Sequence, residues 1–234
     1  MIVLHQYPAA FNLSSLSPFC LKVEFFLKLS RLPYRIQVEL NPRRGPKGKM
    51  PFIVHQQGSV ADSSFIINAL VETHGLHHLR LQQPQQRAQA FAFKTMIEEG
   101  LYHVLLYSRW VDEEGYRVVE KEFLPLFPPV VGKPILRFLR RNLRRQSVAQ
   151  GTGRHQRSEV YQLGGAQVQA LAVLLGTRQF FFEEKLSDFD ATCYAFLSNI
   201  LKQPIESPLK KELSGCRNLC DYVARLDRVM TSRF

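Results

Sequence analysis

The sequence lacks any long run of apolar residues. A helix that crosses a bilayer needs roughly 18 or more mostly apolar residues in succession, and no stretch of this chain comes near that length. The first residues, M-I-V-L-H-Q-Y, also lack the basic lead and long apolar core of a secretory signal. We therefore expect no transmembrane segment and a cytoplasmic location. The 234 residues and the apolar fraction of 45% fit a soluble globular chain with a sizeable core.

Cysteine is scarce, and its spacing excludes several kinds of chemistry. The four cysteines (Cys20, Cys193, Cys216 and Cys220) form no C-x-x-C pair and fall inside predicted helices. This pattern is not that of a disulfide framework, and it favours a reducing compartment. Cys216 and Cys220 lie four residues apart, but no histidine or further cysteine accompanies them, so we expect no metal site. The segment G-T-G-R-H at 151–155 is not a dinucleotide loop, because it follows a helix and lacks a third glycine.

Acidic residues are absent from one segment of the second half. The chain has 31 Lys and Arg against 20 Asp and Glu, a net charge of +11. Residues 133–157 contain one lysine and seven arginines with no acid, so this segment carries +8. In the amphipathic helix predicted at 134–149, the arginines lie away from the apolar side. That basic face is either solvated or binds an acidic partner or an anionic membrane surface. Nucleic acid is not expected, because no recognition motif or stacking platform accompanies the charge.

Residues 1–76 alternate between short strands and helices. The predicted strands are 2–6, 34–40, 52–55 and 59–61. One helix begins at Pro18 with Ser17 as its cap, and another follows Asp62 and ends at Gly75. The order β-α-β and then β-β-α predicts a compact α/β domain.

The remainder of the chain shows helical periods only. The predicted helices are roughly 85–112, 116–127, 134–149, 158–175, 187–202 and 208–230. Ser187 and Asp190 have the spacing of a capping box, and Gly151 is expected to end the arginine-rich helix. We predict a linker at 77–84 and an all-helical C-terminal domain at 85–234.

Two chemical features lie close together around the second strand pair. The Met50-Pro51 bond is predicted to be cis, and a helix begins with Asp62 and Ser63. N–H groups at a helix start attract a carboxylate, while Asp62 can hold an ammonium group. These residues therefore suit the head of an α-amino acid. A proline-started hairpin and a capped helix without any ligand are the alternative interpretation.

Several motifs resemble those of the cytosolic glutathione transferases over nearly the whole chain. The motifs S-P-F-C, G-K-M-P and A-D-S-S occur in the family order, and the S-x-x-D box follows in the helical half. Within the superfamily, the chain looks most like the metaxin and failed-axon-connections branch, including its bacterial members. The stretches E-E-G-L-Y-H-V-L-L-Y-S-R-W and G-T-G-R-H are similar to that branch's pattern. The resemblance implies an α/β thioredoxin-like N-terminal domain of residues 1–76, followed by the helical bundle.

The resemblance also implies roles for single residues toward glutathione, as co-substrate. Ser17 would be the catalytic hydroxyl that faces the glutathione sulfur. The backbone of Met50, before the cis Pro51, would pair with the cysteinyl part of the peptide. Lys49 would approach the negative end of the peptide. No metal is implied.

Asp62 and Ser63 would bind the γ-glutamyl head of glutathione. The chain departs from the commoner family pattern at Asp62, where Glu or Gln would give a longer arm. Cys20, one turn after Ser17, is a second candidate nucleophile, and a packed helical thiol is the alternative. Because Ser17 replaces a first cysteine, a two-cysteine exchange route is excluded.

For the second substrate, the family implies an apolar pocket between the domains that would take an apolar electrophile. Phe11, Tyr107 and Trp110 are the aromatic residues expected there, although each could instead belong to the core. Two functions follow from the resemblance. One is a glutathione transferase, and the other is a non-catalytic, metaxin-like scaffold that binds partners through its surface, the Arg-rich helix included. A homodimer is left open.

Overall fold

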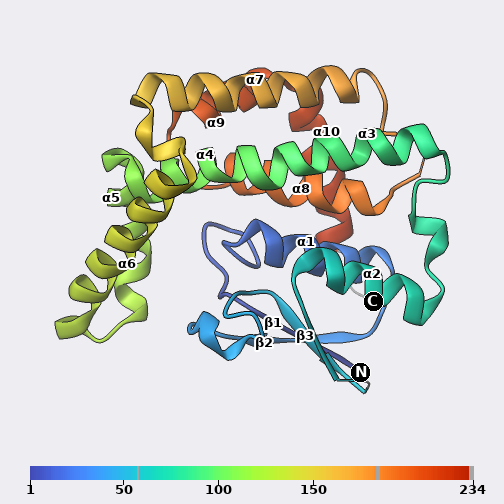
Figure 1. The fold of residues 1–234 in the computed structure, drawn as a ribbon, viewed down its shortest axis with the longest axis horizontal. Coiled ribbons are helices and arrows are strands. Elements are labelled where there is room, and N and C mark those ends of the chain that lie inside the picture. The colour runs from blue at the N-terminus through green and yellow to red at the C-terminus, as the bar shows by residue number, and fades with distance from the viewer. Residues whose placement is uncertain (57, 183–184, 232–234) are drawn as a thin grey trace.

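A four-stranded sheet forms the base of the N-terminal half (Figure 1). The computed structural model describes residues 1–56, 58–182 and 185–231. The strands are β1 (Ile2–Gln6), β2 (Tyr34–Val38), β3 (Phe52–His55) and β4 (Gly58–Ala61). Their order is β2-β1-β3-β4; β1 and β2 run parallel, and β3 runs antiparallel to β1 and β4. The predicted α/β arrangement is confirmed.

Two helices lie between this sheet and the helical half of the molecule (Figure 1). They are α1 (Pro18–Leu29) and α2 (Ser63–His74). Ser17 caps α1 and Asp62 caps α2, as their residue types predict. The helix α2 ends at Gly75, whose φ of 65° is the left-handed conformation that glycine adopts at low cost.

The strand predicted at 34–40 is shorter than expected and lies at an edge of the sheet. It ends at Val38, and a short 3₁₀ turn, η1 (Pro42–Arg44), follows it. The alternating apolar residues Ile36, Val38 and Leu40 are 40%, 50% and 55% exposed. The alternation of apolar and polar residues therefore identified the strand, but because β2 is an edge strand its apolar side chains remain largely exposed to solvent.

The second half of the chain is helical, as predicted. A short 3₁₀ turn, η2 (His77–Leu79), precedes it. Its helices are α3 (Pro84–Thr95), α4 (Tyr102–Leu106), α5 (Glu113–Phe123), α6 (Pro129–Gln150), α7 (Arg157–Leu175), α8 (Asp188–Leu201), α9 (Pro208–Gly215) and α10 (Arg217–Thr231). The π-helical segment η3 (Met96–Leu101) joins α3 to α4, and a second one, η4 (Tyr107–Val111), continues α4, so that the four form one continuous run. That run matches the helix predicted at 85–112.

The helix α8 is the centre of the core. Its predicted capping box is confirmed, because Asp190 accepts hydrogen bonds from the Ser187 N–H at 2.9 Å and the Ser187 hydroxyl at 2.8 Å. The helix packs against α1 through Phe196, whose ring lies 5.3 Å from that of Phe19. One cluster of buried side chains runs from the sheet through α1 to α8 and α10. The two halves therefore share a continuous core.

Three predicted helices have other bounds than expected. The helix predicted at 116–127 is α5, which begins at Glu113 because Asp112 caps it, and a 3₁₀ turn, η5 (Leu124–Leu126), follows it. The helix at 134–149 begins five residues earlier, at Pro129, because proline is well tolerated at the first helical position. The helix predicted at 208–230 is two helices that break at Cys216, whose ψ of 85° is not helical. The weak helix formers Ser214 and Gly215 precede the break. Cys216 therefore lies between α9 and α10, not inside a helix.

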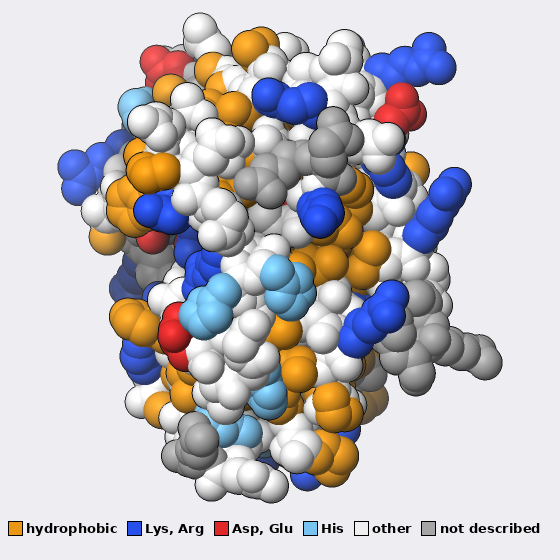
Figure 2. All heavy atoms as spheres, turned by 90° about the vertical axis from the view of Figure 1, so that its right-hand side faces the viewer, with side chains coloured by type: hydrophobic (Ala, Val, Ile, Leu, Met, Phe, Trp, Pro, Cys, Tyr) orange, Lys and Arg blue, Asp and Glu red, His pale blue; other side chains and the backbone are white. Residues whose placement is uncertain are grey.

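The surface reflects the excess of basic residues. On the side of the molecule in Figure 2, many more Lys and Arg side chains than Asp and Glu side chains are visible. Among the described residues, no helix has the length and apolar character needed to span a membrane.

Candidate functional site

The hydroxyl of Ser17 lies at the start of α1. Ser17 has extended backbone angles and is half-buried, and its Oγ accepts a hydrogen bond from the Cys20 N–H at 3.4 Å. Pro18 follows at the first helical position and sets the helical φ in advance. Because accepting a bond uses only a lone pair, the Ser17 proton remains available for donation. The cap predicted from the sequence is thus also a hydrogen-bond donor at a helix N-terminus.

Cys20 is a packed thiol. It is fully buried in a small cluster with Met50, Phe52 and Ala61. Burial raises the pKa of the Cys20 thiol to about 11, although hydrogen bonding with Ser17 acts in the opposite direction. At neutral pH the group is therefore a protonated thiol, and this geometry favours a structural role.

The segment before β3 lies against the first turn of α1. The Met50-Pro51 bond is cis, as predicted. Met50 is 7% exposed and shares its cluster with Cys20. The Pro51 carbonyl accepts a hydrogen bond from the Asp62 N–H at 3.4 Å. The structure therefore brings Met50 and Pro51 between the starts of α1 and α2.

The start of α2 presents one exposed and one buried polar side chain. Asp62 has a φ of 82° and is exposed, and its Oδ1 accepts a hydrogen bond from the Ser64 N–H at 2.9 Å. Ser63 is 3% exposed, and its Oγ accepts a hydrogen bond from Nζ of Lys22 at 3.2 Å. Lys22 thus connects α1 to α2, and it hydrogen-bonds to the Ser63 hydroxyl that the resemblance assigns to glutathione.

Lys49 is exposed on the loop before β3. It lies near enough to His103 of α4 for its charge to act on the imidazole. The pKa of His103 is lowered, mainly by burial and further by the Lys49 charge, while Glu99 acts in the opposite direction. Lys49 therefore faces the helical half, as a residue that contacts a ligand between the halves would.

Two tyrosines that we did not predict lie near Cys20. Tyr7, directly after β1, packs against the Cys20 cluster, and burial raises its pKa to about 12. Tyr102 stacks edge-on against Phe19 with ring centroids 5.0 Å apart, and burial raises its pKa. Both phenols are protonated at neutral pH and can donate. The only sequence signal for Tyr102 was its place in the E-E-G-L-Y-H stretch, and Tyr7 stood out only as an aromatic after a strand.

Arg109 is a buried cation that sequence reasoning also missed. Nη1 donates to the carbonyl oxygen of Leu16 at 2.8 Å, Nε to Gln203 Oε1 at 2.8 Å, and Nη2 to the carbonyl and Oδ1 of Asn199 at 2.9 and 3.0 Å. Burial lowers the pKa of the guanidinium to about 9, so it stays charged at neutral pH. None of these partners is a carboxylate, so an uncompensated positive charge lies beside the residue before Ser17.

The three aromatic residues expected in a second-substrate pocket separate into two places. Phe11 and Trp110 lie in one apolar cluster with Phe123, whose ring centroid is 6.5 Å from that of Phe11 and 6.2 Å from that of Trp110. Tyr107 instead belongs to the main core and packs edge-on against Tyr161. The structure thus unites two of the three, and their role toward a substrate stays a prediction.

Metal ligands do not gather at this site. Within the part of the chain that the structure describes, no three His, Cys, Asp or Glu side chains come together in a way that could hold an ion.

Comparisons with known proteins identify the family and the fold of the chain. A family model described as "Glutathione S-transferase N-terminal domain" matches residues 18–115, and one described as "Glutathione S-transferase, C-terminal domain" matches residues 164–226. A solved glutathione S-transferase of Ceriporiopsis subvermispora, in complex with glutathione, superposes with a TM-score of 0.62 at 16% identity. That match covers 99% of this chain and 98% of the other, and it shows the same fold.

Three proteins are similar in sequence over most of this chain. Failed axon connections of Drosophila melanogaster is 30% identical over 97% of the chain, which spans 57% of that longer protein. The isoprene-epoxide–glutathione S-transferase of Rhodococcus sp. (strain AD45) is 29% identical, over 97% of this chain and 98% of its own length. Metaxin-1 of Sus scrofa is 25% identical, over 95% of this chain and 73% of its own length. With both family models matched in chain order on a thioredoxin-like sheet and a helical bundle, the chain belongs to the glutathione transferase superfamily, in its metaxin-like branch.

Proposed function

We propose that the protein binds glutathione and transfers its sulfur to a small apolar electrophile. The observation that carries this proposal is the convergence of two helix starts. The Ser17 hydroxyl at the start of α1 and the exposed Asp62 at the start of α2 lie around one cluster that contains Cys20 and Met50. A peptide that carries a thiol at its centre and an α-amino acid head at one end matches these two termini.

We propose that residues 1–76 form the glutathione-binding domain, 77–84 a linker and 85–234 a helical domain. Each end of glutathione has a chemical counterpart in residues 1–76. The γ-glutamyl ammonium binds Asp62, and its carboxylate lies at the N–H groups that begin α2. The backbone of Met50 pairs with the cysteinyl part, and Lys49 meets the terminal carboxylate. The Ser63 hydroxyl, held by Lys22, is left to donate its proton to the head group.

Ser17 favours the ionised form of the bound sulfur. A free thiol has a pKa near 8.5, so only a few per cent is thiolate at neutral pH. A hydrogen bond from Ser17, the start of α1 and the nearby charge of Arg109 together favour the anion. A decrease of about two pKa units corresponds to roughly 2.7 kcal/mol and makes most of the bound thiol nucleophilic.

Titration calorimetry with glutathione and conjugation of an aryl halide test this proposal. The wild type is expected to bind glutathione and to form the conjugate, Ser17→Ala to keep the fold and lose most of the rate, and Cys20→Ala to lose little. If Cys20→Ala is the inactive variant, the protein is a thiol-exchange enzyme. If the wild type does not bind glutathione, the transferase proposal is wrong.

The electrophile is proposed to enter beside Phe11 and Trp110. The protein is proposed to act in the cytoplasm.

A scaffold is the second candidate function, and one surface favours it. A groove of about 740 Å³ between α5 and α6 is lined by arginines 137, 140, 141, 144 and 145. Among described residues, Arg140 bonds to Glu113 and to the Trp110 carbonyl, whereas the other four have no hydrogen bond or ion pair. Such a surface suits an acidic protein partner. The scaffold would be supported if the protein does not bind glutathione, binds polyglutamate, and loses polyglutamate binding in Arg141→Glu.

A further inference from the structure

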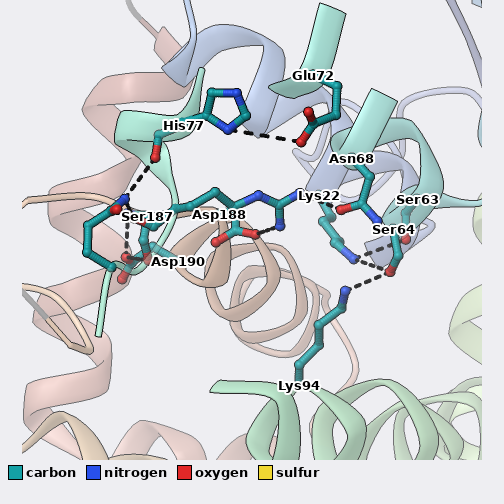
Figure 3. Close-up of polar contacts among 12 residues, drawn as sticks. Lys22, Ser63, Ser64, Asn68, Glu72, His77, Lys94, Ser187, Asp188 and Asp190 are labelled. Carbon is teal, nitrogen blue, oxygen red and sulfur yellow. Dashed lines mark hydrogen bonds and ion pairs between the residues drawn. The ribbon is translucent and has the colours of Figure 1, made fainter. Parts of the chain in front are cut away.

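A second, smaller cavity lies where α2, α3 and the start of α8 meet. Its volume is about 200 Å³, and α2 contributes Ser64 and Asn68 to its lining. The helix α3 contributes Arg87 and Lys94, and Thr192 comes from α8. Figure 3 shows Lys22 of α1 and Lys94 of α3 pointing toward Ser64 at the start of α2. No residue of this lining is among those assigned to glutathione.

Two ammonium groups meet at one hydroxyl in this cavity (Figure 3). Lys22 Nζ donates to Ser64 Oγ at 3.3 Å, and Lys94 Nζ donates to the same oxygen at 2.7 Å. Two positively charged groups that contact the same oxygen atom repel each other. Lys22 is 1% exposed, so water does little to screen that repulsion, and its ion pair with Glu98 at 2.7 Å compensates only one of the two charges.

The whole cavity carries an excess of positive charge. Among the residues that the structure describes, Lys22, Lys94, Arg80 and Arg87 are the cations, and the carboxylates in contact are Asp188 in the lining and Glu98 on Lys22. Four positive and two negative groups leave a charge of +2. Arg80 is bonded to Asp188 and Asn68, and Arg87 donates to the Gln82 carbonyl at 2.9 Å and to no other described residue. A ligand that carries two negative charges would therefore neutralise this excess.

Two further observations point to a ligand rather than to chance clustering. Thr192 is fully buried and lines the cavity, and its hydroxyl has no hydrogen-bond partner among the described residues. A buried hydroxyl without a partner costs free energy that a ligand oxygen would recover. Burial, together with the Lys94 charge, also lowers the pKa of Lys22 to about 8, a loss of charge that an anion would oppose.

We propose that this cavity binds a phosphate group, either as inorganic phosphate or as a phosphate monoester. Two negative charges match the excess of +2, and phosphate oxygens accept hydrogen bonds from Lys94, the Ser64 hydroxyl and Thr192. This binding site goes beyond the proposed transferase function and does not depend on it, because Ser17 and Met50 take no part.

Titration calorimetry with inorganic phosphate in a chloride buffer of fixed ionic strength tests the site. The wild type is expected to bind with a Kd of about 1 mM or lower. Lys94→Gln should weaken binding about tenfold or more, and Thr192→Val, which keeps the shape and removes the hydroxyl, should weaken it severalfold. Lys211→Gln, at an exposed lysine of α9 whose side chain has no hydrogen-bond partner among described residues, is the matched control and should bind as the wild type does.

A parallel titration with glycerol 3-phosphate identifies the source of the phosphate. Tighter binding than that of inorganic phosphate supports an organic monoester as the ligand, and equal or weaker binding supports free phosphate. An absence of phosphate binding by the wild type would overturn the proposal. The same holds if Lys94→Gln and Lys211→Gln bind phosphate equally. Because the readout contains no glutathione, a failure here leaves the transferase proposal untouched.

Discussion

Arg109 of η4 donates a hydrogen bond to the carbonyl oxygen of Leu16, which lies 2.8 Å from its Nη1 atom. This bond connects the helical half to the residue directly before Ser17. The same guanidinium is held by Asn199 on α8 and by Gln203 just after it. The position of the Ser17 hydroxyl is therefore set by a side chain more than ninety residues away in sequence.

Replacing Arg109 should destabilise the fold strongly. Arg109→Met leaves the Leu16 carbonyl and the Asn199 and Gln203 side chains without their donor, and each buried polar group without a partner costs about 1–3 kcal/mol. We expect a loss of about 3 kcal/mol or more in the free energy of unfolding, measured by urea denaturation. Arg141→Met is the control and should change stability by less than about 0.5 kcal/mol. Equal stability of the two variants would contradict this role for Arg109.

The four cysteines should differ in their reaction with an alkylating agent. Cys20 and Cys193 are fully buried with raised pKa values, whereas Cys220 is only partly buried. We expect mass spectrometry of the native protein at pH 8 to find Cys220 modified first and Cys20 only after unfolding. Rapid native labelling of Cys20 would show that it is a reactive thiol.

The γ-glutamyl contact should depend on Asp62. Its side chain is exposed, so Asp62→Ala is expected to keep the fold at a modest cost in stability, from the lost cap bond to the Ser64 N–H and from alanine at a φ of 82°. A charge-assisted contact with the ligand ammonium contributes about 1.5–3 kcal/mol, so glutathione affinity should decrease roughly ten- to hundredfold. Calorimetry measures the change, and Glu72→Ala, later on the same helix, is the control. Unchanged affinity in Asp62→Ala would mean that the head group binds elsewhere.

Stability should rise with pH through the titration of Lys22. Burial and the Lys94 charge lower its pKa from 10.5 to about 8 in the folded chain, although Glu98 acts in the opposite direction. Between these two pKa values the unfolded chain binds more protons than the folded one, so the free energy of unfolding increases with pH. From pH 7 to 9.5 the contribution is about 2 kcal/mol.

Lys22→Gln removes this contribution, and groups that do not interact with Lys22 titrate alike in both proteins. In phosphate-free buffer, the difference in unfolding free energy between wild type and variant should change by that amount over the pH range. A difference that stays constant with pH would show that Lys22 titrates normally.

Local signals in the sequence predicted most of the fold. Ser17 before Pro18, Asp62 before an apolar run, and the box of Ser187 and Asp190 each act within a few residues of chain, so they can be identified without tertiary structure. The break at Cys216 was missed because the apolar period continues through it.

The parts of the site that were missed depend on long-range contacts. Lys22 looked like an ordinary residue of an amphipathic helix, and only its approach to Ser63 and Glu98 buries it. Arg109 was one residue of a family motif, and nothing near it in sequence indicates that its guanidinium reaches Leu16. Buried cations of this kind are determined by packing between segments, which a sequence pattern does not encode.

The most direct test of the central claim is the pKa of the glutathione thiol when bound, measured from its thiolate absorbance across a pH series. For the wild type we predict a value about two units below the 8.5 of a free thiol, and for Ser17→Ala a value close to that of the free thiol. Calorimetry on the same samples confirms that both proteins hold the ligand. A bound thiol with an unshifted pKa in the wild type, or the same shift in Ser17→Ala, would contradict the account.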